Sequence, residues 1–287
     1  MKTNKLTKQV AEASVMIAFA TVLSIFKMVE MPYGGAVTLA SMLPILIVSY
    51  RHGIKMGLIS GFTYSVIQQL IGLNNLSYFT TWQSVVAVML LDYVAAFTVI
   101  GVGGIFKNRI GMKKNTPKSK QRIEMALGMG IVCVIRYACH TIAGATVWAG
   151  LSIPTEAALV YSLSYNATYM IPEALISVIV CVWVGEIIDF SKSIPVRFLP
   201  SDKSEGAKRG SACEILARIP VFLLLFAVCF GILLVAPHLQ DAESGEFTFG
   251  NLYNVNFVLL VSVCSLCAAA SLVCTFISRS LKGKEQK

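Results

Sequence analysis

Apolar runs long enough to cross a membrane recur along the whole 287-residue chain. A helix needs about 20 apolar residues to cross the hydrocarbon core, where lipid offers the backbone no other hydrogen-bond partner. The second run is short and contains Pro44, so we expect it to be tilted, broken or partly interfacial. The predicted membrane helices cover residues 10–29, 37–50, 55–73, 83–106, 123–143, 158–189, 215–236 and 255–277.

Composition agrees with a membrane protein, because 56% of the residues are hydrophobic and only 14% are charged. Soluble domains are nearer one quarter charged, on the order of 25%. The net charge of +9 would suit nucleic-acid binding, but the basic residues lie between the apolar runs. Membrane topology is the simpler explanation, and we expect no nucleic-acid partner.

The basic residues occupy every second connection. Lysine and arginine cluster at the start, after the second, fourth and sixth predicted helices, and at the end. The connections 30–36, 74–82, 144–157 and 237–254 are nearly free of base. Because cytoplasmic loops are rich in Lys and Arg, we predict a multi-pass cell-membrane protein with both termini cytoplasmic.

Two domains are expected, separated by a linker of mixed charge that contains Pro195, Pro200 and Gly206. The predicted ranges are a six-helix membrane domain at 1–190, a basic cytoplasmic linker at 191–214 and a two-helix membrane extension at 215–287.

The sequence predicts neither a metal site nor a catalytic residue. Seven of the eight cysteines fall in apolar segments and Cys213 in a basic loop, which suits neither a disulfide framework nor a metal site. No nucleophile and base stand at a recognised spacing, so we do not expect an enzyme.

Four ionisable residues fall inside predicted membrane helices, where a charge costs roughly 2.5–3.5 kcal/mol on insertion scales and is a candidate functional group. Arg136 and His140 are four residues apart and share a helix face. Two interpretations of Asp92 stay open: an ion pair with Arg136, or a ligand contact. The four residues are Asp92, Arg136, His140 and Glu173.

A polar stripe runs along the sixth predicted helix. Tyr161, Tyr165, Tyr169 and Glu173 recur at every fourth position, which places them along one helix face. Asn166 lies beside the stripe, too deep for the lipid headgroups. It therefore needs a partner on a neighbouring helix or a ligand.

Aromatic residues from other helices are expected on the same outer side. Tryptophan and tyrosine faces attract a cation by roughly 0.5–2 kcal/mol each, and a buried carboxylate supplies the counter-charge. The pattern therefore favours a flat heteroaromatic ligand that carries positive charge. The residues that accompany the stripe are Tyr64, Gln68, Gln69, Tyr78, Trp82 and Trp148.

Small residues recur at spacings that let membrane helices approach closely. Gly53, Gly57 and Gly61 form a GxxxGxxxG row, and the first helix carries the pairs Ser14 with Ala18 and Ala20 with Ser24. Packing within the chain and docking of another membrane subunit are both open interpretations.

Three stretches resemble a known family: PYGGAVTLASMLPILIVSYRHGIKMG (32–57), LLDYVAAFTVIGVGGIF (90–106) and an H-x7-W…VYSLSYNATYMIPE pattern (140–173). In this order they are similar to the thiamine-specific substrate-binding (S) components, the ThiT family, of energy-coupling factor (ECF) vitamin transporters. The resemblance covers residues 8–190.

The resemblance implies an all-α integral membrane protein, with an S-component-like bundle of six helices that takes thiamine from outside. The loop between the first two helices would form a lid that hinges at Gly34 and Gly35. Thiamine would pass through a shared module of one transmembrane coupling protein and two ATPase subunits. The chain itself has no Walker A pattern, and no cofactor is implied for it.

The resemblance also implies individual roles. Asp92 would face the cationic or amino groups of thiamine, Trp148 would stack, and Tyr161 and Asn166 would bond its pyrimidine end. The implied binding residues are Asp92, His140, Trp148, Tyr161, Asn166, Tyr64 and Tyr93. The implied coupling-protein contact is the small-residue face of the first helix, with Ser14, Ala18, Ala20 and Ser24.

Two features depart from the family pattern. The two C-terminal transmembrane helices are additional, and the lid offers only Tyr33 as an aromatic residue. The alternative function is a stand-alone, ion-coupled secondary transporter for a cationic heteroaromatic vitamin, in which Asp92, Arg136 and Glu173 relay protons. Such transporters usually contain internal repeats, and no second copy of the 148–173 pattern is present.

Overall fold

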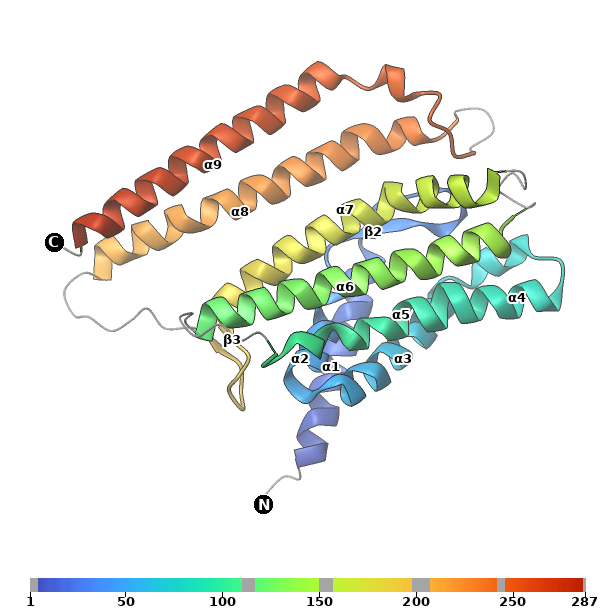
Figure 1. Ribbon diagram of the computed structural model, residues 1–287, viewed down its shortest axis with the longest axis horizontal. Coiled ribbons are helices and arrows are strands. Elements are labelled where there is room, and N and C mark those ends of the chain that lie inside the picture. Colours follow the sequence, from blue (N-terminus) through green and yellow to red (C-terminus); the bar gives the residue numbers. More distant parts are fainter. Residues whose placement is uncertain (1–4, 110–116, 150–156, 198–206, 242–245, 286–287) are drawn as a thin grey trace. The chain divides into compact units, whose positions relative to one another are not determined.

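The computed structural model describes residues 5–109, 117–149, 157–197, 207–241 and 246–285. The chain divides into two compact units, Met1–Arg197 and Phe198–Lys287 (Figure 1). Both consist mainly of helices, as expected for an all-α membrane protein. Within the described residues, the helices long and apolar enough to cross a membrane are Lys5–Ile25, Trp82–Phe106, Lys118–Thr146, Ala158–Ile187, Leu216–Leu239 and Phe257–Ser278.

The first unit contains a bundle of helices and two short β-hairpins. Its helices are α1 (Lys5–Ile25), α2 (Leu43–His52), α3 (Ile54–Ile71), α4 (Trp82–Val88), α5 (Ala96–Thr98), α6 (Pro117–Thr146) and α7 (Ala158–Ile187). A π-helical segment (Met89–Ala95) joins α4 to α5, and 3-10 segments cover Pro32–Gly34, Leu73–Tyr78 and Val99–Phe106. The antiparallel strand pairs are β1 (Lys27–Glu30) with β2 (Ala36–Thr38), and β3 (Ile188–Asp189) with β4 (Val196–Arg197).

The expected membrane helix at 37–50 is wrong as a span. Residues 36–38 form β2. Helix α2 has ten residues, and those from Leu43 to Tyr50 are buried. Ten residues make about 15 Å of helix, half of the roughly 30 Å hydrocarbon core. The first helix ends at Ile25 instead of residue 29, because Lys27–Glu30 pairs with Ala36–Thr38.

The small-residue rows pack mainly within the chain. A Cβ atom at Gly57 would lie 2.5 Å from the Gly101 carbonyl oxygen, so α3 contacts the Val99–Phe106 segment backbone to backbone. On α1, Ala20 and Ser24 are buried, and the Ser24 hydroxyl accepts a hydrogen bond of 2.7 Å from Gln68 on α3. Of the four residues implied as the coupling-protein contact, Ser14 and Ala18 are therefore the two that remain exposed.

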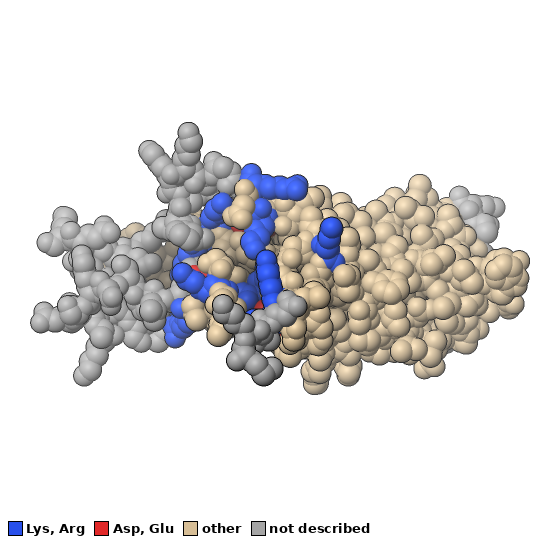
Figure 2. Space-filling view, turned by 90° about the horizontal axis from the view of Figure 1, so that it is seen from below, with Lys and Arg blue, Asp and Glu red and all other residues tan. Residues whose placement is uncertain are grey.

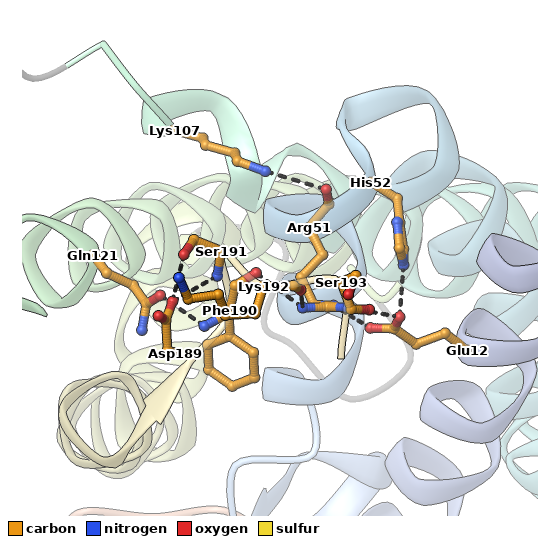
Figure 3. A network of polar contacts seen from close by, with 10 residues as sticks. All are labelled: Glu12, Arg51, His52, Lys107, Gln121, Asp189, Phe190, Ser191, Lys192 and Ser193. Carbon is orange, nitrogen blue, oxygen red and sulfur yellow. Dashed lines mark hydrogen bonds and ion pairs between the residues drawn. The ribbon is translucent and has the colours of Figure 1, made fainter. Parts of the chain in front are cut away.

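Arg51 at the end of α2 connects three parts of the first unit (Figure 3). Its guanidinium donates two hydrogen bonds to the Glu12 carboxylate on α1. It also donates to the carbonyl oxygens of Phe190 at 2.9 Å, Lys192 at 3.1 Å and Ser193 at 3.2 Å, just beyond α7. This planar fork of donors holds the ends of α1, α2 and α7 together.

Basic side chains gather at one end of the face drawn in Figure 2, and the rest of that face is nearly free of charge. Lys107 lies near Arg51 and donates to the Arg51 carbonyl oxygen at 3.1 Å. Burial lowers the pKa of Lys107, and the neighbouring charge of Arg51 lowers it further. Charge at this end is therefore partly enclosed by the fold.

The second unit consists of α8 (Ala207–Val235) and α9 (Phe257–Glu285), which pack against each other. Two 3-10 segments, Ala236–Leu239 and Leu252–Asn254, lie between them. Helix α8 begins inside the range 191–214 that the sequence assigned to a linker, and residues 198–206 of that range lie outside the described residues.

We predict that Arg51→Met lowers the thermal unfolding midpoint in detergent, measured by tryptophan fluorescence. The substitution removes the Arg51 donors from Glu12 and from three carbonyl oxygens, and among the described residues only His52 still pairs with Glu12. Removing one partner of a buried pair costs about 3–5 kcal/mol. The Arg51 and Glu12 side chains are 4% and 21% exposed, so water replaces these bonds poorly. The exposed Lys55→Met is the matched control, and equal midpoints for the two variants would contradict a structural role for Arg51.

Candidate functional site

A cavity of about 170 Å³ lies inside the first unit. Its walls come from α1, α3, α6, α7 and the helix that runs from Trp82 to Phe106, and the hairpin of β1 and β2 adds Gly34, Gly35, Ala36 and Thr38. The sequence-predicted residues that line it are Asp92, His140, Trp148, Tyr161, Asn166, Tyr64 and Tyr93.

Asp92 joins two of these residues. One carboxylate oxygen lies 2.9 Å from His140 Nδ1, and the other accepts a hydrogen bond of 2.8 Å from Trp148 Nε1. An ionised carboxylate only accepts, so Nδ1 of His140 carries a proton in this arrangement. Asp92 and Tyr93 lie in the π-helical segment, a feature that often occurs at functional sites, and both line the cavity.

The possible ion pair between Asp92 and Arg136 does not form. In the described part of the chain, Arg136 has no carboxylate within 4.0 Å. Its guanidinium lies 4.5 Å from the centre of the Phe97 ring, Nη1 contacts the Met42 sulfur at 2.9 Å, and Nε is buried without a partner. Arg136 is therefore a buried cation that lines the cavity and is stabilised by an aromatic face.

Trp148 lies in an aromatic cluster at the cavity. Its ring packs edge-on against Phe79 with a centroid distance of 4.6 Å, and Tyr78 and Tyr33 follow at 6.0 and 6.2 Å. Tyr161 also packs against this cluster. The bond to Asp92 and these neighbours fix the indole plane, so one aromatic face has a defined orientation.

Tyr64 and Tyr93 support the wall around Phe97. Tyr64 is fully buried and packs edge-on against Phe97 at 5.6 Å, and Tyr93 stacks on the same ring at 6.4 Å. The Tyr93 hydroxyl donates to the Gly72 carbonyl at 3.1 Å and accepts from Asn75. These contacts position Phe97 beneath Arg136.

Asn166 has its partners on its own helix. Its amide nitrogen donates to the Ser162 carbonyl at 2.8 Å, and its amide oxygen accepts from the Tyr169 hydroxyl at 2.5 Å. Ser162 in turn donates to the Thr141 carbonyl on α6 at 2.9 Å. Ser162 thus makes the hydrogen bond to the neighbouring helix α6, and residues of α7 itself orient the Asn166 side chain.

Glu173 and Tyr165 on α7 hold the hairpin of β1 and β2. The Glu173 carboxylate accepts hydrogen bonds from the backbone N–H and, at 2.7 Å, from the hydroxyl of Thr38. The Tyr165 hydroxyl donates to the Pro32 carbonyl and accepts from the Gly35 N–H at 3.4 Å. The polar stripe expected on this helix therefore contacts the hairpin as well as the cavity.

The cavity has a net negative charge when its carboxyl groups are ionised. Asp92 and Glu173 contribute two negative charges and Arg136 one positive charge, which leaves one negative charge with His140 neutral. Lys27 also lines the cavity, but it pairs with Glu30 at 2.5 Å. His140 Nε2 is buried without a hydrogen-bond partner in the part of the chain that the structure describes. The arrangement can therefore hold a flat monocation and offers polar atoms for its ring nitrogens.

Sequence reasoning missed several lining residues, including Phe97, Thr38 and Asn75. Phe97 follows Tyr93 by four positions, so helical spacing was an available signal. Thr38 and Asn75 lie outside the predicted stripe, and only the folded chain places them at the cavity. Trp82, expected at the same site, is 72% exposed and does not line the cavity.

Comparison with known proteins gives consistent matches. The family model described as "Thiamine transporter protein (Thia_YuaJ)" matches residues 10–189. The thiamine transporter ThiT of Bacillus subtilis (strain 168) is 34% identical over 183 residues, which is 63% of this chain and 91% of the relative. A solved structure of ThiT from Listeria monocytogenes shares the fold, with a TM-score of 0.51, 21% identity, and coverage of 64% of this chain and 96% of that one.

We predict that Gly35→Ala displaces the hairpin from α7. An added Cβ atom would lie 2.7 Å from two ring carbons of Tyr169 and 3.0 Å from the Tyr165 hydroxyl. Overpacking of this kind typically costs about 1–3 kcal/mol. The expected results are a lower thermal unfolding midpoint and faster amide hydrogen exchange in residues 27–38.

Gly130→Ala on α6 is the matched control, because the added Cβ atom would meet no described atom within 4 Å apart from its chain neighbours and the backbone of its own helix. Alanine is also the better helix former, so its midpoint should not fall. If Gly35→Ala exchanged as slowly as this control, the close contact between the hairpin and α7 would be refuted.

Proposed function

This chain belongs to the thiamine transporter family, and we propose that it is the substrate-binding subunit of an ECF-type importer that captures thiamine outside the cell. Transport, not catalysis, is the activity for which the family is named. The cavity of the first unit is the proposed binding site.

The Asp92 carboxylate is the observation that supports this proposal most strongly. It lies within a membrane helix, where an isolated charge is costly, and it is held by an imidazole and an indole next to an aromatic cluster. Thiamine is a cationic molecule with two flat heteroaromatic rings. A cavity with aromatic walls and one net negative charge is complementary to it in charge and offers faces for stacking.

The proposed roles follow from the positions of the side chains. Asp92 provides the counter-charge or accepts from the amino group, and Trp148 stacks on a ring. Among the described residues, His140 Nε2 has no hydrogen-bond partner, so it is proposed to bond the ligand. Tyr161 and Asn166 contact the pyrimidine end, and Tyr64 and Tyr93 position the aromatic wall.

We further propose that ATP is hydrolysed by partner subunits and that α1 docks on a transmembrane coupling protein. Ser14 and Ala18 are exposed one helical turn apart, beside Val15 and Phe19, which are 66% and 53% exposed. Small residues between exposed apolar side chains suit close packing against another membrane helix. The basic end in Figure 2 would be cytoplasmic. Both termini would also be cytoplasmic, because the sequence at each is rich in lysine.

The proposed function first predicts that the purified chain binds thiamine in detergent. Thiamine should quench its tryptophan fluorescence to saturation, and Trp148→Ala should abolish most of this signal. Asp92→Asn should weaken binding by about 10- to 100-fold, because hydrogen bonds to a charged group contribute about 1.5–3 kcal/mol each. Isothermal titration calorimetry provides the dissociation constants.

Asp189→Asn is the matched control, since Asp189 lies beyond α7 and bonds Ser191 instead of the cavity residues. It should bind thiamine like the wild type. A folded wild-type protein that did not respond to thiamine would refute the proposed ligand, and a vitamin screen would follow.

A transport assay distinguishes the importer from a stand-alone, ion-coupled transporter. Proteoliposomes that contain only this chain should bind thiamine without accumulating it under a proton or sodium gradient. Accumulation should require the coupling protein, the two ATPase subunits and ATP. Gradient-driven uptake by the chain alone would instead support the secondary transporter.

The geometry supports the importer over a proton relay through Asp92, Arg136 and Glu173. In the described part of the chain, the bonds of Asp92 lead only to His140 and Trp148, and those of Glu173 lead to Thr38. Within these described residues, hydrogen bonds do not connect the two carboxylates, and the Arg136 Nε atom has no hydrogen-bond partner.

A further inference from the structure

The hairpin of β1 and β2 covers the cavity but has little stability of its own. It pairs Lys27 with Thr38 and Glu30 with Ala36, with an irregularity between Lys27 and Val29. A two-stranded hairpin of this size is marginal in isolation. Its position must therefore depend on what it packs against, and β2 lies against α7 (Figure 1).

Helix α7 binds the hairpin at two levels. Tyr165 bonds the tip through Pro32 and Gly35, and Glu173 bonds the base through Thr38. The two residues are eight positions apart, which is about 12 Å along a helix and nearly the same face. The tip contacts are neutral hydrogen bonds, and those at the base are made to a carboxylate, which are stronger.

Glu173 is an unusual residue to bury at this position. It is 3% exposed within a membrane helix, and it has no basic partner within 4.0 Å among the described residues. A buried carboxylate is tolerated when donors satisfy its oxygens. Here the donors are the N–H and hydroxyl of Thr38, and the Thr38 hydroxyl is itself positioned by Ser41 at 2.9 Å.

These donors belong to the hairpin and not to α7. Lifting the hairpin would strip Glu173 of both hydrogen bonds and leave a charge in a cavity between membrane helices. The closed position is therefore favoured by the two charge-assisted hydrogen bonds that lifting the hairpin would break.

We propose that Glu173 is the positioning residue that latches the hairpin over the cavity and thereby sets how slowly a bound ligand leaves. This inference rests on the proposed function for its ligand, thiamine. The latch acts through Thr38, and Glu173 need not touch the ligand.

Stopped-flow fluorescence tests the latch by measuring thiamine release from the full chain in detergent. Glu173→Leu removes both acceptors and should accelerate release about 10- to 100-fold, with a smaller change in the association rate. Thr38→Val removes the hydroxyl but keeps the backbone N–H, so its acceleration should be intermediate.

Glu173→Gln separates the latch from simple charge attraction. The glutamine carbonyl can accept from the Thr38 N–H while its amide donates to the Thr38 hydroxyl, so both bonds survive without the charge. Release should then be clearly slower than in Glu173→Leu, and any acceleration over the wild type would reflect the lost charge alone. If Gln and Leu accelerated release equally, attraction of the cation would explain the effect and the latch would be overturned.

Glu186→Leu is the matched control, because Glu186 is a carboxylate on the same helix that pairs with Lys118 and Arg122 away from the cavity. It should release thiamine like the wild type. A Glu173→Leu variant that released thiamine as slowly as this control would also overturn the latch.

Amide hydrogen exchange without ligand keeps the latch testable apart from the proposed function. Residues 27–38 should exchange faster in Glu173→Leu than in Glu173→Gln, the wild type and Glu186→Leu, while α6 keeps its protection. Equal exchange in all four proteins would overturn the latch. Wild-type protein that failed to bind thiamine yet showed this exchange pattern would refute the ligand and support the latch.

Discussion

The carboxylate of Asp92 is the interaction around which the site is organised. Lipid offers no water to a buried charge, so the fold itself has to supply the partners. His140 and Trp148 do so from the end of α6 and the segment after it, and in return their rings are oriented toward one cavity. One partly buried charge thus accounts for the orientation of two side chains that line the cavity.

The same constraint explains why the cavity has a wall that is not helical. Backbone outside a helix is tolerated at membrane depth only where protein covers it or satisfies it. Tyr165 and Glu173 provide this satisfaction for the hairpin of β1 and β2. The polar stripe of α7 therefore serves two purposes, because it lines the cavity and also bonds the segment that covers it.

The family match and the fold place the cavity in the first unit, and α8 and α9 lie beyond the matched residues 10–189. Both helices are apolar enough to cross a membrane, and they pack on each other. The first unit holds all of the cavity-lining residues. The proposed binding site therefore lies within the residues that the family model matches, and the two C-terminal helices lie outside them.

Periodicity and composition by themselves determined the membrane class, most helix positions and the residues that carry buried charge, because a hydrocarbon environment restricts each of these locally. The partners of those charges depended on tertiary structure. The sequence left open whether Asp92 forms an ion pair with Arg136 or contacts a ligand. In the fold, Asp92 bonds His140 and Trp148. Arg136 instead lies over the Phe97 ring. The sequence predicts a membrane helix at 37–50, whereas in the fold Thr38 belongs to a strand and bonds Glu173, 135 positions away. Contacts between distant segments are set by packing, which no local pattern records.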